Sequence, residues 1–258
     1  MICKYCGKEI ADDSEFCPEC GQTLGEEVEK PEEETPSSKA QAVSAPGEPH
    51  MACVLLLDSS YSMNGKAMDS LNKAINMFQK QTALDELAQK RIDIAIIEFN
   101  EGARVVQEFT PLSQMKPVRL VPTGETSMGA GINLAIDKVK ERNRFYASMG
   151  TPCFKPWIFM ITDGEPTDDI SVARDRIREE ESKGRHGKLK FWAVGVGDYS
   201  EDVLKSLTNR CISLDEANFE GIFNWLSESM VAISVSRVGD EPEAGGLPKG
   251  AKALSTEW

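Results

Sequence analysis

Short apolar runs alternate along the chain with stretches in which apolar residues recur at helical spacing. The runs are of the kind that form strands buried on both faces of a sheet, and they lie at residues 52–57, 157–162 and 189–196. Apolar residues three and four positions apart predict helices over residues 66–80, 127–145, 168–182, 200–208 and 218–234. Strands that alternate with helices of this length predict an α/β fold with a mostly parallel sheet and helices on both faces.

Two further strands are predicted over residues 91–99 and 103–110, joined by the turn Asn100-Glu101-Gly102. This hairpin would add one antiparallel edge strand to the sheet. A short strand is expected at residues 211–214. The polar stretch between the 66–80 helix and the 91–99 strand predicts no element.

The two ends of the chain differ in composition from this central part. Residues 25–50 are rich in Glu and Pro, and such a segment cannot bury enough apolar surface to order itself. We expect a flexible linker there. Residues 237–258 return to Gly, Pro and Glu and are predicted to be a disordered tail. We therefore expect four segments: a small N-terminal segment over residues 1–24, a linker over 25–50, a main domain over 51–236 and a tail over 237–258.

Residues 1–24 contain two Cys-x-x-Cys pairs separated by ten residues, each followed by glycine. This spacing is typical of a closed, tetrahedral Zn²⁺ site, with the four thiolates of Cys3, Cys6, Cys17 and Cys20 as ligands. A redox pair is the alternative, and two pairs at this spacing favour zinc. The segment resembles the short zinc ribbons at the ends of many bacterial and archaeal proteins. Acidic residues outnumber lysines here, which favours protein docking or a spacer role over nucleic-acid binding.

Whole-chain composition narrows the classes of partner. The chain has 258 residues, 40% of them hydrophobic, and a net charge of −13, which argues against a nucleic acid or an anionic membrane surface as the main partner. No apolar run approaches the roughly 20 residues needed to cross a bilayer, and no signal peptide is recognisable, so we expect a cytoplasmic protein. The remaining thiols, Cys53, Cys153 and Cys211, are expected to be buried or partly buried and not catalytic.

Oxygen-bearing side chains follow the predicted strands. Asp58, Ser60 and Ser62 come after the first strand, Asp163 follows the 157–162 strand, and Thr126 precedes the 127–145 helix. Because parallel strands end at the same edge of a sheet, we expect these side chains to converge. Hard oxygen donors are the ligands that Mg²⁺ or Mn²⁺ prefers. Any one of them alone is more often a turn or helix-cap residue, but the five together favour a metal site.

This set resembles the metal-ion-dependent adhesion site of von Willebrand factor type A (vWA) domains, whose pattern is Asp-x-Ser-x-Ser…Thr…Asp. The resemblance covers nearly all of residues 51–236 and implies the Rossmann-like vWA fold. It also implies that the two serines and Thr126 hold the metal, with Asp58 and Asp163 acting mainly through bound water. The metal would then bind a Glu or Asp carboxylate of a partner protein, and the protein would not be an enzyme. Tyr61 stands where many members of the family have glycine.

Within the family, the segments MACVLLLDSSYSM and ITDGEPTDD are most similar to the bacterial tellurium-resistance-associated group. That resemblance implies a context of stress or phage-defence signalling, with kinase and phosphatase partners.

Two other functions stay open at this point. A bound Mg²⁺ can activate water, so a Mg²⁺-dependent phosphohydrolase is possible in chemical terms, although the sequence offers no P-loop, second metal cluster or well-placed general base. A degenerate vWA scaffold that assembles without metal is the other. Thr167 or Asp168 is interpreted as the cap of the 168–182 helix.

Overall fold

A computed structural model of the chain describes residues 9, 11, 45, 47–82, 85–183, 188–215, 218–240 and 245–255. The chain divides into two units, Met1–Ala40 and Gln41–Trp258, and the fold below is that of the second unit. The four cysteines of the predicted zinc site and nearly all of the predicted linker lie outside the described residues.

One seven-stranded sheet runs through the described part of the second unit, in the order β3-β2-β1-β4-β5-β6-β7. Strands β1, β2, β4, β5 and β6 are parallel, while β3 and β7 pair antiparallel at the two edges. The mostly parallel sheet and the antiparallel β3 edge confirm the predicted fold class. The strands are β1 (Met51–Asp58), β2 (Ile92–Phe99), β3 (Ala103–Pro111), β4 (Trp157–Thr162), β5 (Lys190–Val196), β6 (Cys211–Leu214) and β7 (Ala251–Ala253).

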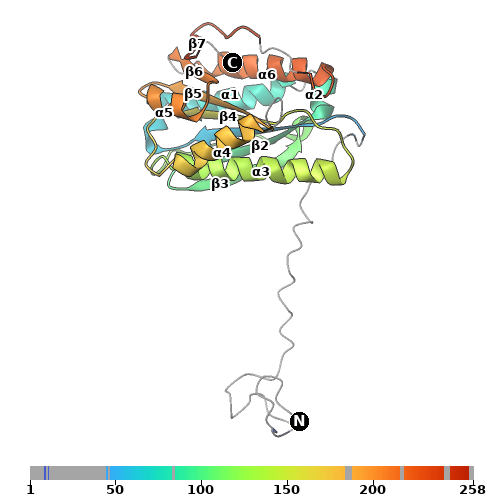
Figure 1. The fold of residues 1–258 in the computed structure, drawn as a ribbon. Coiled ribbons are helices and arrows are strands. Elements are labelled where there is room, and N and C mark those ends of the chain that lie inside the picture. Colours follow the sequence, from blue (N-terminus) through green and yellow to red (C-terminus); the bar gives the residue numbers. More distant parts are fainter. Residues whose placement is uncertain are drawn as a thin grey trace. The chain divides into compact units, whose positions relative to one another are not determined.

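Helices cover both faces of the sheet (Figure 1). One face packs against α1 (Lys66–Thr82), α2 (Glu86–Arg91) and α6 (Phe219–Val235). The other packs against α3 (Met128–Ser148), α4 (Ser171–Ser182) and α5 (Glu201–Leu207). Two 3-10 turns, η1 (Tyr61–Met63) and η2 (Leu112–Gln114), follow β1 and β3. None of the helices in the described ranges is long and apolar enough to span a membrane.

Strand β1 lies at the centre of the sheet and contributes to both hydrophobic cores. Because alternate residues of a strand point to opposite faces, Cys53, Leu55 and Leu57 join the core under α1 and α6. Ala52, Val54 and Leu56 join the core under α3 and α4. All six side chains are fully buried, which explains why this segment reads as a continuous apolar run. As expected, Cys53 and Cys211 are buried thiols and Cys153 is partly buried.

The C-terminal segment differs from its prediction. Residues 245–255 are not a disordered tail, because β7 adds an antiparallel strand to β6. The buried Trp225 side chain donates its indole N–H to the Gly245 carbonyl at 2.7 Å, and Leu247 packs against the core of α1 and α6. The three-residue strand is too short for periodicity to reveal, so composition alone pointed to disorder.

His50 was placed in the flexible linker by composition, but the structure buries it completely. Its Nδ1 lies 3.2 Å from Asp93 Oδ2 at the amino end of β2. The same carboxylate oxygen accepts hydrogen bonds from Arg142 at 2.9 Å and from the Tyr146 hydroxyl at 2.5 Å, both on α3. The ordered domain therefore begins before residue 51.

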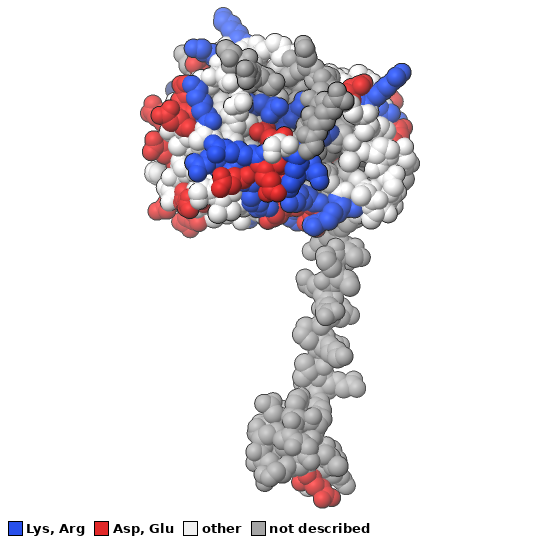
Figure 2. Space-filling model, viewed as in Figure 1, with Lys and Arg blue, Asp and Glu red and all other residues white. Residues whose placement is uncertain are grey.

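Charged side chains pair across the surface of α3 and α4. Arg176 of α4 forms an ion pair with Asp137 of α3, and Lys140 of α3 does so with Glu180 of α4. Figure 2 shows this face of the molecule, where basic and acidic side chains lie beside one another. These pairs account for the Arg- and Glu-rich sequence of α4.

Candidate metal centre

The carboxyl ends of β1 and β4 bring two aspartates to the same edge of the sheet. Leu57 of β1 is paired in register with Ile161 of β4, so Asp58 and Thr162 end their strands side by side. Asp163 follows directly. The Thr162 hydroxyl donates to Asp58 Oδ2 at 2.5 Å, which joins the two strand ends through a side-chain hydrogen bond.

Hydrogen bonds connect four of the five predicted ligands into one chain. The backbone N–H of Ser60 donates to Asp58 Oδ1 at 2.8 Å. The Ser60 and Ser62 hydroxyl oxygens are 2.9 Å apart, and the Ser62 hydroxyl donates to Asp163 Oδ1 at 2.6 Å. The Asp-x-Ser-x-Ser spacing thus places both serine hydroxyls on the same side of the loop, between the two carboxylates.

Asp58 is fully buried, and both of its oxygens accept hydrogen bonds within the protein. Burial raises its pKa to about 6, and the charge of Asp163 adds to this effect, while the hydrogen bonds from Ser60 and Thr162 oppose it. A carboxylate held in this way orients the loop and favours a cation nearby, because a positive charge would offset the cost of its buried charge.

Thr126 completes the set from a different loop. Its side chain is 6% exposed, and its hydroxyl makes no hydrogen bond to any residue that the structure describes. A Cβ atom placed on Gly164 would lie 3.5 Å from Thr126 Oγ1 and 3.6 Å from Ser62 Oγ. The two hydroxyls therefore face a common space, which stays open because residue 164 has no side chain.

The donor set fits a hard divalent cation. The Thr126 and Ser62 hydroxyls face one space, and the Ser60 hydroxyl and the Asp163 carboxylate are each within hydrogen-bond distance of Ser62. All of these donors are oxygens, as a hard cation prefers. Burial raises the pKa of Asp163, the Ser62 hydrogen bond lowers it, and the charge of Asp198 raises it further. The described residues contain no group of three or more His, Cys, Asp or Glu side chains suited to a metal.

The loop after β4 supports Thr126, a role that local sequence patterns did not reveal. The Thr167 hydroxyl accepts a hydrogen bond from the Thr126 backbone N–H at 3.1 Å. Asp168 accepts from the N–H groups of Gly129 and Ala130, each at 2.9 Å, and so caps α3.

The predicted cap of α4 by Thr167 or Asp168 is therefore wrong. The N-cap of α4 is Ile170, which makes no side-chain cap hydrogen bond, and the Asp169 carboxylate before it accepts from both the N–H and the hydroxyl of Ser171. Thr167 and Asp168 instead bind the loop and helix that begin near Thr126. Local sequence patterns cannot predict these contacts, because about 40 residues separate the partners.

Tyr61 stands where the family often has glycine, and the local turn accepts its side chain without strain in the backbone. It begins the 3-10 turn η1, a conformation open to any residue, and its N–H donates to the Gly124 carbonyl at 3.1 Å. Its side chain is 68% exposed.

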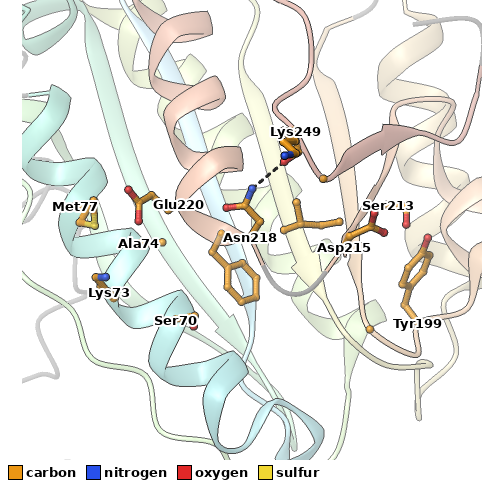
Figure 3. Close-up of a pocket in the computed structure, with 14 residues that line it drawn as sticks. Ser70, Lys73, Ala74, Met77, Tyr199, Ser213, Asp215, Asn218, Glu220 and Lys249 are labelled. Atoms are coloured by element: carbon orange, nitrogen blue, oxygen red, sulfur yellow. Dashed lines mark hydrogen bonds between the residues drawn. The ribbon is translucent and has the colours of Figure 1, made fainter.

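An open pocket of about 990 Å³ lies between α1, the end of β6 and the start of α6 (Figure 3). Its polar side chains include two lysines and two acids, Lys73, Lys249, Asp215 and Glu220. Within it, the Asn218 side-chain amide donates to the Lys249 carbonyl at 2.9 Å. None of the five predicted metal ligands lines this pocket.

The family model of the von Willebrand factor type A domain matches residues 53–223. The chain belongs to this family. The model of the zinc-ribbon domain matches residues 2–24, in agreement with the predicted ribbon. The four cysteines themselves remain predicted Zn²⁺ ligands, since they lie outside the described residues.

Solved structures with the same fold include adhesive and matrix proteins. The vWF domain of the type V pili tip protein Mfa5 from Porphyromonas gingivalis has a TM-score of 0.52 at 14% identity, covering 73% of this chain and 97% of that one. The pilus adhesin SpaC from Lactobacillus rhamnosus GG has a TM-score of 0.54 at 13% identity, covering 72% and 31%.

A third structure is proximal thread matrix protein 1 from the mussel byssus, determined with a zinc-occupied MIDAS motif. It has a TM-score of 0.50 at 12% identity, with 71% of this chain and 48% of that chain covered. This chain spans less than half the length of the mussel and Lactobacillus proteins, and identities this low show the fold alone. Comparison with curated proteins gives no match.

Proposed function

We propose that this protein is a metal-dependent protein-interaction module that binds a Glu or Asp carboxylate of a partner protein through Mg²⁺ or Mn²⁺. The observation that carries the proposal is the shared space between the Thr126 and Ser62 hydroxyls, one of them unpartnered among the described residues, with the Asp163 carboxylate beside it. Ser60, Ser62 and Thr126 would hold the metal, and Asp58 and Asp163 would act mainly through bound water.

The residues divide this task in a way that suits ligand capture. Asp58 uses both oxygens to orient Ser60 and to bind Thr162, so it positions the loop. Three neutral hydroxyls would leave the metal with much of its positive charge, and Mg²⁺ commonly keeps exchangeable waters. When bound, the metal supplies a coordination position that an incoming carboxylate oxygen can take. The proposed role is binding rather than catalysis.

The biological setting is a further part of the proposal. The segments Met51–Met63 and Ile161–Asp169 resemble the tellurium-resistance-associated group, which supports a role in bacterial stress-response or defence signalling with a kinase or phosphatase as partner. The zinc ribbon would serve docking or spacing, and a cytoplasmic location fits the expected free thiols.

Mn²⁺ titration of the full chain, followed by electron paramagnetic resonance, tests the metal site. Wild type should bind one Mn²⁺ that Mg²⁺ displaces, and Asp163→Ala should lose it. Asp137→Ala removes a carboxylate from the exposed surface of α3 and should bind as wild type does. Equal binding by Asp163→Ala and wild type would refute the assignment.

Pull-down from native lysate then tests the interaction. The full chain should retain a partner in Mg²⁺ and release it in Mg²⁺-free buffer, which keeps the predicted Zn²⁺ in place better than a chelator does. Retention by Asp58→Ala in Mg²⁺ would mean that the metal site is structural. Turnover of a generic phosphoester that Asp58→Ala abolishes would favour the phosphohydrolase instead.

A further inference from the structure

The loops around the metal centre carry acidic side chains and no lysine or arginine. These loops are residues 59–65, 100–102, 121–127, 163–170 and 197–200. Five exposed acids lie on them, and one of these, Asp169, is bound to Ser171 at the start of α4. We name the other four the acidic rim: Glu101, Glu125, Glu165 and Asp198. Acidic side chains gather at the left margin of the domain in Figure 2, at the end where α5 lies in Figure 1. The nearest cation along these loops is Lys66, the first residue of α1.

Each member of the acidic rim lies on a loop that borders the candidate metal centre. The Glu101 side chain lies over Gly124, within 2.1 Å of where a Cβ on that glycine would be. Asp198 follows the end of β5, the strand that pairs with β4, so it lies at the same end of the sheet as Asp163. Glu125 and Glu165 are the chain neighbours of Thr126 and Gly164.

The four rim acids have no cationic partner among the described residues, unlike the paired acids of α3 and α4. None of the four forms an ion pair or side-chain hydrogen bond with another residue in the described ranges. On α3 and α4, by contrast, Asp137 and Glu180 are paired with Arg176 and Lys140. Uncompensated like charges around one opening repel one another and attract cations from outside.

Tyr61 adds an aromatic surface within this acidic rim. Its ring is 68% exposed, while its backbone is tied to the Thr126 loop through the Gly124 carbonyl. An exposed tyrosine attracts the guanidinium of Arg or the ammonium of Lys and packs against their aliphatic stems. The rim therefore offers two complementary contacts to a basic side chain.

A ligand site at the centre of the rim rests on a separate observation. The Thr126 side chain is 6% exposed, its hydroxyl has no partner among the described residues, and it faces the same space as Ser62. The centre thus presents a hydroxyl with no partner among the described residues, while the rim repels any segment with extra negative charge.

We infer that the carboxylate recognised here lies in a basic segment of the partner, one Glu or Asp with Lys or Arg on both sides. The inference rests on the proposed function and names the chemistry of its ligand. Electrostatic complementarity of this kind raises the association rate and discriminates between partners. It also weakens with salt, because charges at the surface are screened beyond about 8 Å at physiological ionic strength.

Fluorescence anisotropy of labelled peptides on the full chain tests this, with Mn²⁺ at a concentration that saturates each variant. The three peptides differ only around one position: Lys and Arg flanking Glu, Gly and Ser flanking Glu, and Lys and Arg flanking Gln. We expect the basic Glu peptide to bind at least tenfold more tightly than the neutral one at low salt. The basic Gln peptide should bind weakly, and removing Mn²⁺ should abolish the difference between Glu and Gln.

Matched variants distinguish the effect of the acidic rim on peptide binding from the effect of the protein's net charge. Replacing Glu101 and Glu165 by Gln and Asp198 by Asn should remove the advantage of the basic Glu peptide. A control with Glu86 and Glu228 changed to Gln and Asp137 to Asn removes the same charge elsewhere and should keep that advantage. Tyr61→Ala should reduce it several-fold.

The outcomes distinguish the inference from the proposed function. Equal binding of the basic and neutral Glu peptides in Mn²⁺ would overturn the inference and leave the proposed function intact. Equal binding of the Glu and Gln peptides, with or without Mn²⁺, would overturn the carboxylate mechanism itself, as would the failure of every peptide to bind.

Discussion

Thr126 and Thr167 are joined by two hydrogen bonds that run in opposite directions. The Thr126 N–H donates to the Thr167 hydroxyl at 3.1 Å, and the Thr167 N–H donates to the Thr126 carbonyl at 3.0 Å. Asp168 adds two bonds to the first turn of α3. The loop that carries Thr126 is thereby attached to the loop that carries Asp163, although about 40 residues separate them along the chain.

The first prediction concerns Thr167→Val, which keeps the shape of the side chain and removes the hydrogen bond to the Thr126 N–H. We expect Mn²⁺ affinity to fall by about tenfold or more, as for other residues that orient metal ligands, with little change in melting temperature. Mn²⁺ titration and thermal unfolding measure the two effects. Thr123→Val is the matched control, because that exposed threonine belongs to the same loop and its hydroxyl has no partner among the described residues. Wild-type Mn²⁺ affinity in Thr167→Val would show that the loop holds Thr126 without it.

The second prediction concerns the space beside Gly164. An added Cβ would lie in ordinary van der Waals contact with the Thr126 and Ser62 hydroxyls, so Gly164→Ala should fold normally. The methyl group would occupy the space that faces both oxygens, and we expect Mn²⁺ affinity to fall at least tenfold.

Gly102→Ala serves as its control, because a Cβ there meets nothing within 4 Å. If Gly164→Ala bound Mn²⁺ as tightly as Gly102→Ala, the metal would have to lie elsewhere.

The third prediction is a pH dependence that arises from Asp58. Its pKa is raised to about 6 by burial and by the charge of Asp163. Because protons compete with the metal for the ionised form, Mn²⁺ affinity should fall about tenfold between pH 7 and pH 5. Titrations at a series of pH values measure this directly.

In the metal-free protein, the raised pKa of Asp58 should make the folded state more stable at low pH than at high pH. The folded protein holds the Asp58 proton more tightly than the unfolded chain, so the unfolding free energy should fall as the pH rises from about 4 to 6. Asp58→Asn lacks this titration. The stability difference between wild type and Asp58→Asn should therefore move against wild type over that range. A difference that stays constant with pH would contradict the raised pKa.

The fourth prediction concerns Asp93, which lies at the amino ends of the parallel strands, whereas the candidate metal centre lies at their carboxyl ends. Burial raises its pKa, but the hydrogen bond from His50 and the interactions with Arg142 and Tyr146 outweigh this and hold the pKa below its usual value. Asp93→Asn would remove the buried negative charge that contacts Arg142, His50 and Tyr146, and we expect a loss of about 3–5 kcal/mol in unfolding free energy.

Urea unfolding at pH 7 measures this loss, and Mn²⁺ affinity should stay unchanged. Since the pKa of Asp93 is lowered, its contribution is present at neutral pH and disappears only as the pH falls below about 4. Asp137→Asn, which breaks an exposed ion pair with Arg176, should cost less than about 1 kcal/mol. A similar loss in both variants would mean that burial of the Asp93 network adds nothing.

Much of the fold could be predicted because the strands of a parallel sheet are buried on both faces. The run Trp157–Thr162 was predicted with the bounds that the structure shows, and the helix predicted over residues 66–80 is α1. The short helix α2 was missed because it has few apolar positions, and β7 because it has three residues. Periodicity needs several turns or several alternations before it is visible.

The sequence by itself determined how the predicted ligands that share a loop are placed. In Asp-x-Ser-x-Ser the spacing alone sets Ser60 and Ser62 on one side of a turn, and the apolar run before Asp58 brings them to the edge of the sheet. Only the tertiary structure decided that Thr167 and Asp168 serve Thr126 and α3, and that His50 belongs to the buried Asp93 network. Each of these relationships joins segments far apart along the chain, and such contacts exist only after the sheet has brought the loops at each end of its strands together.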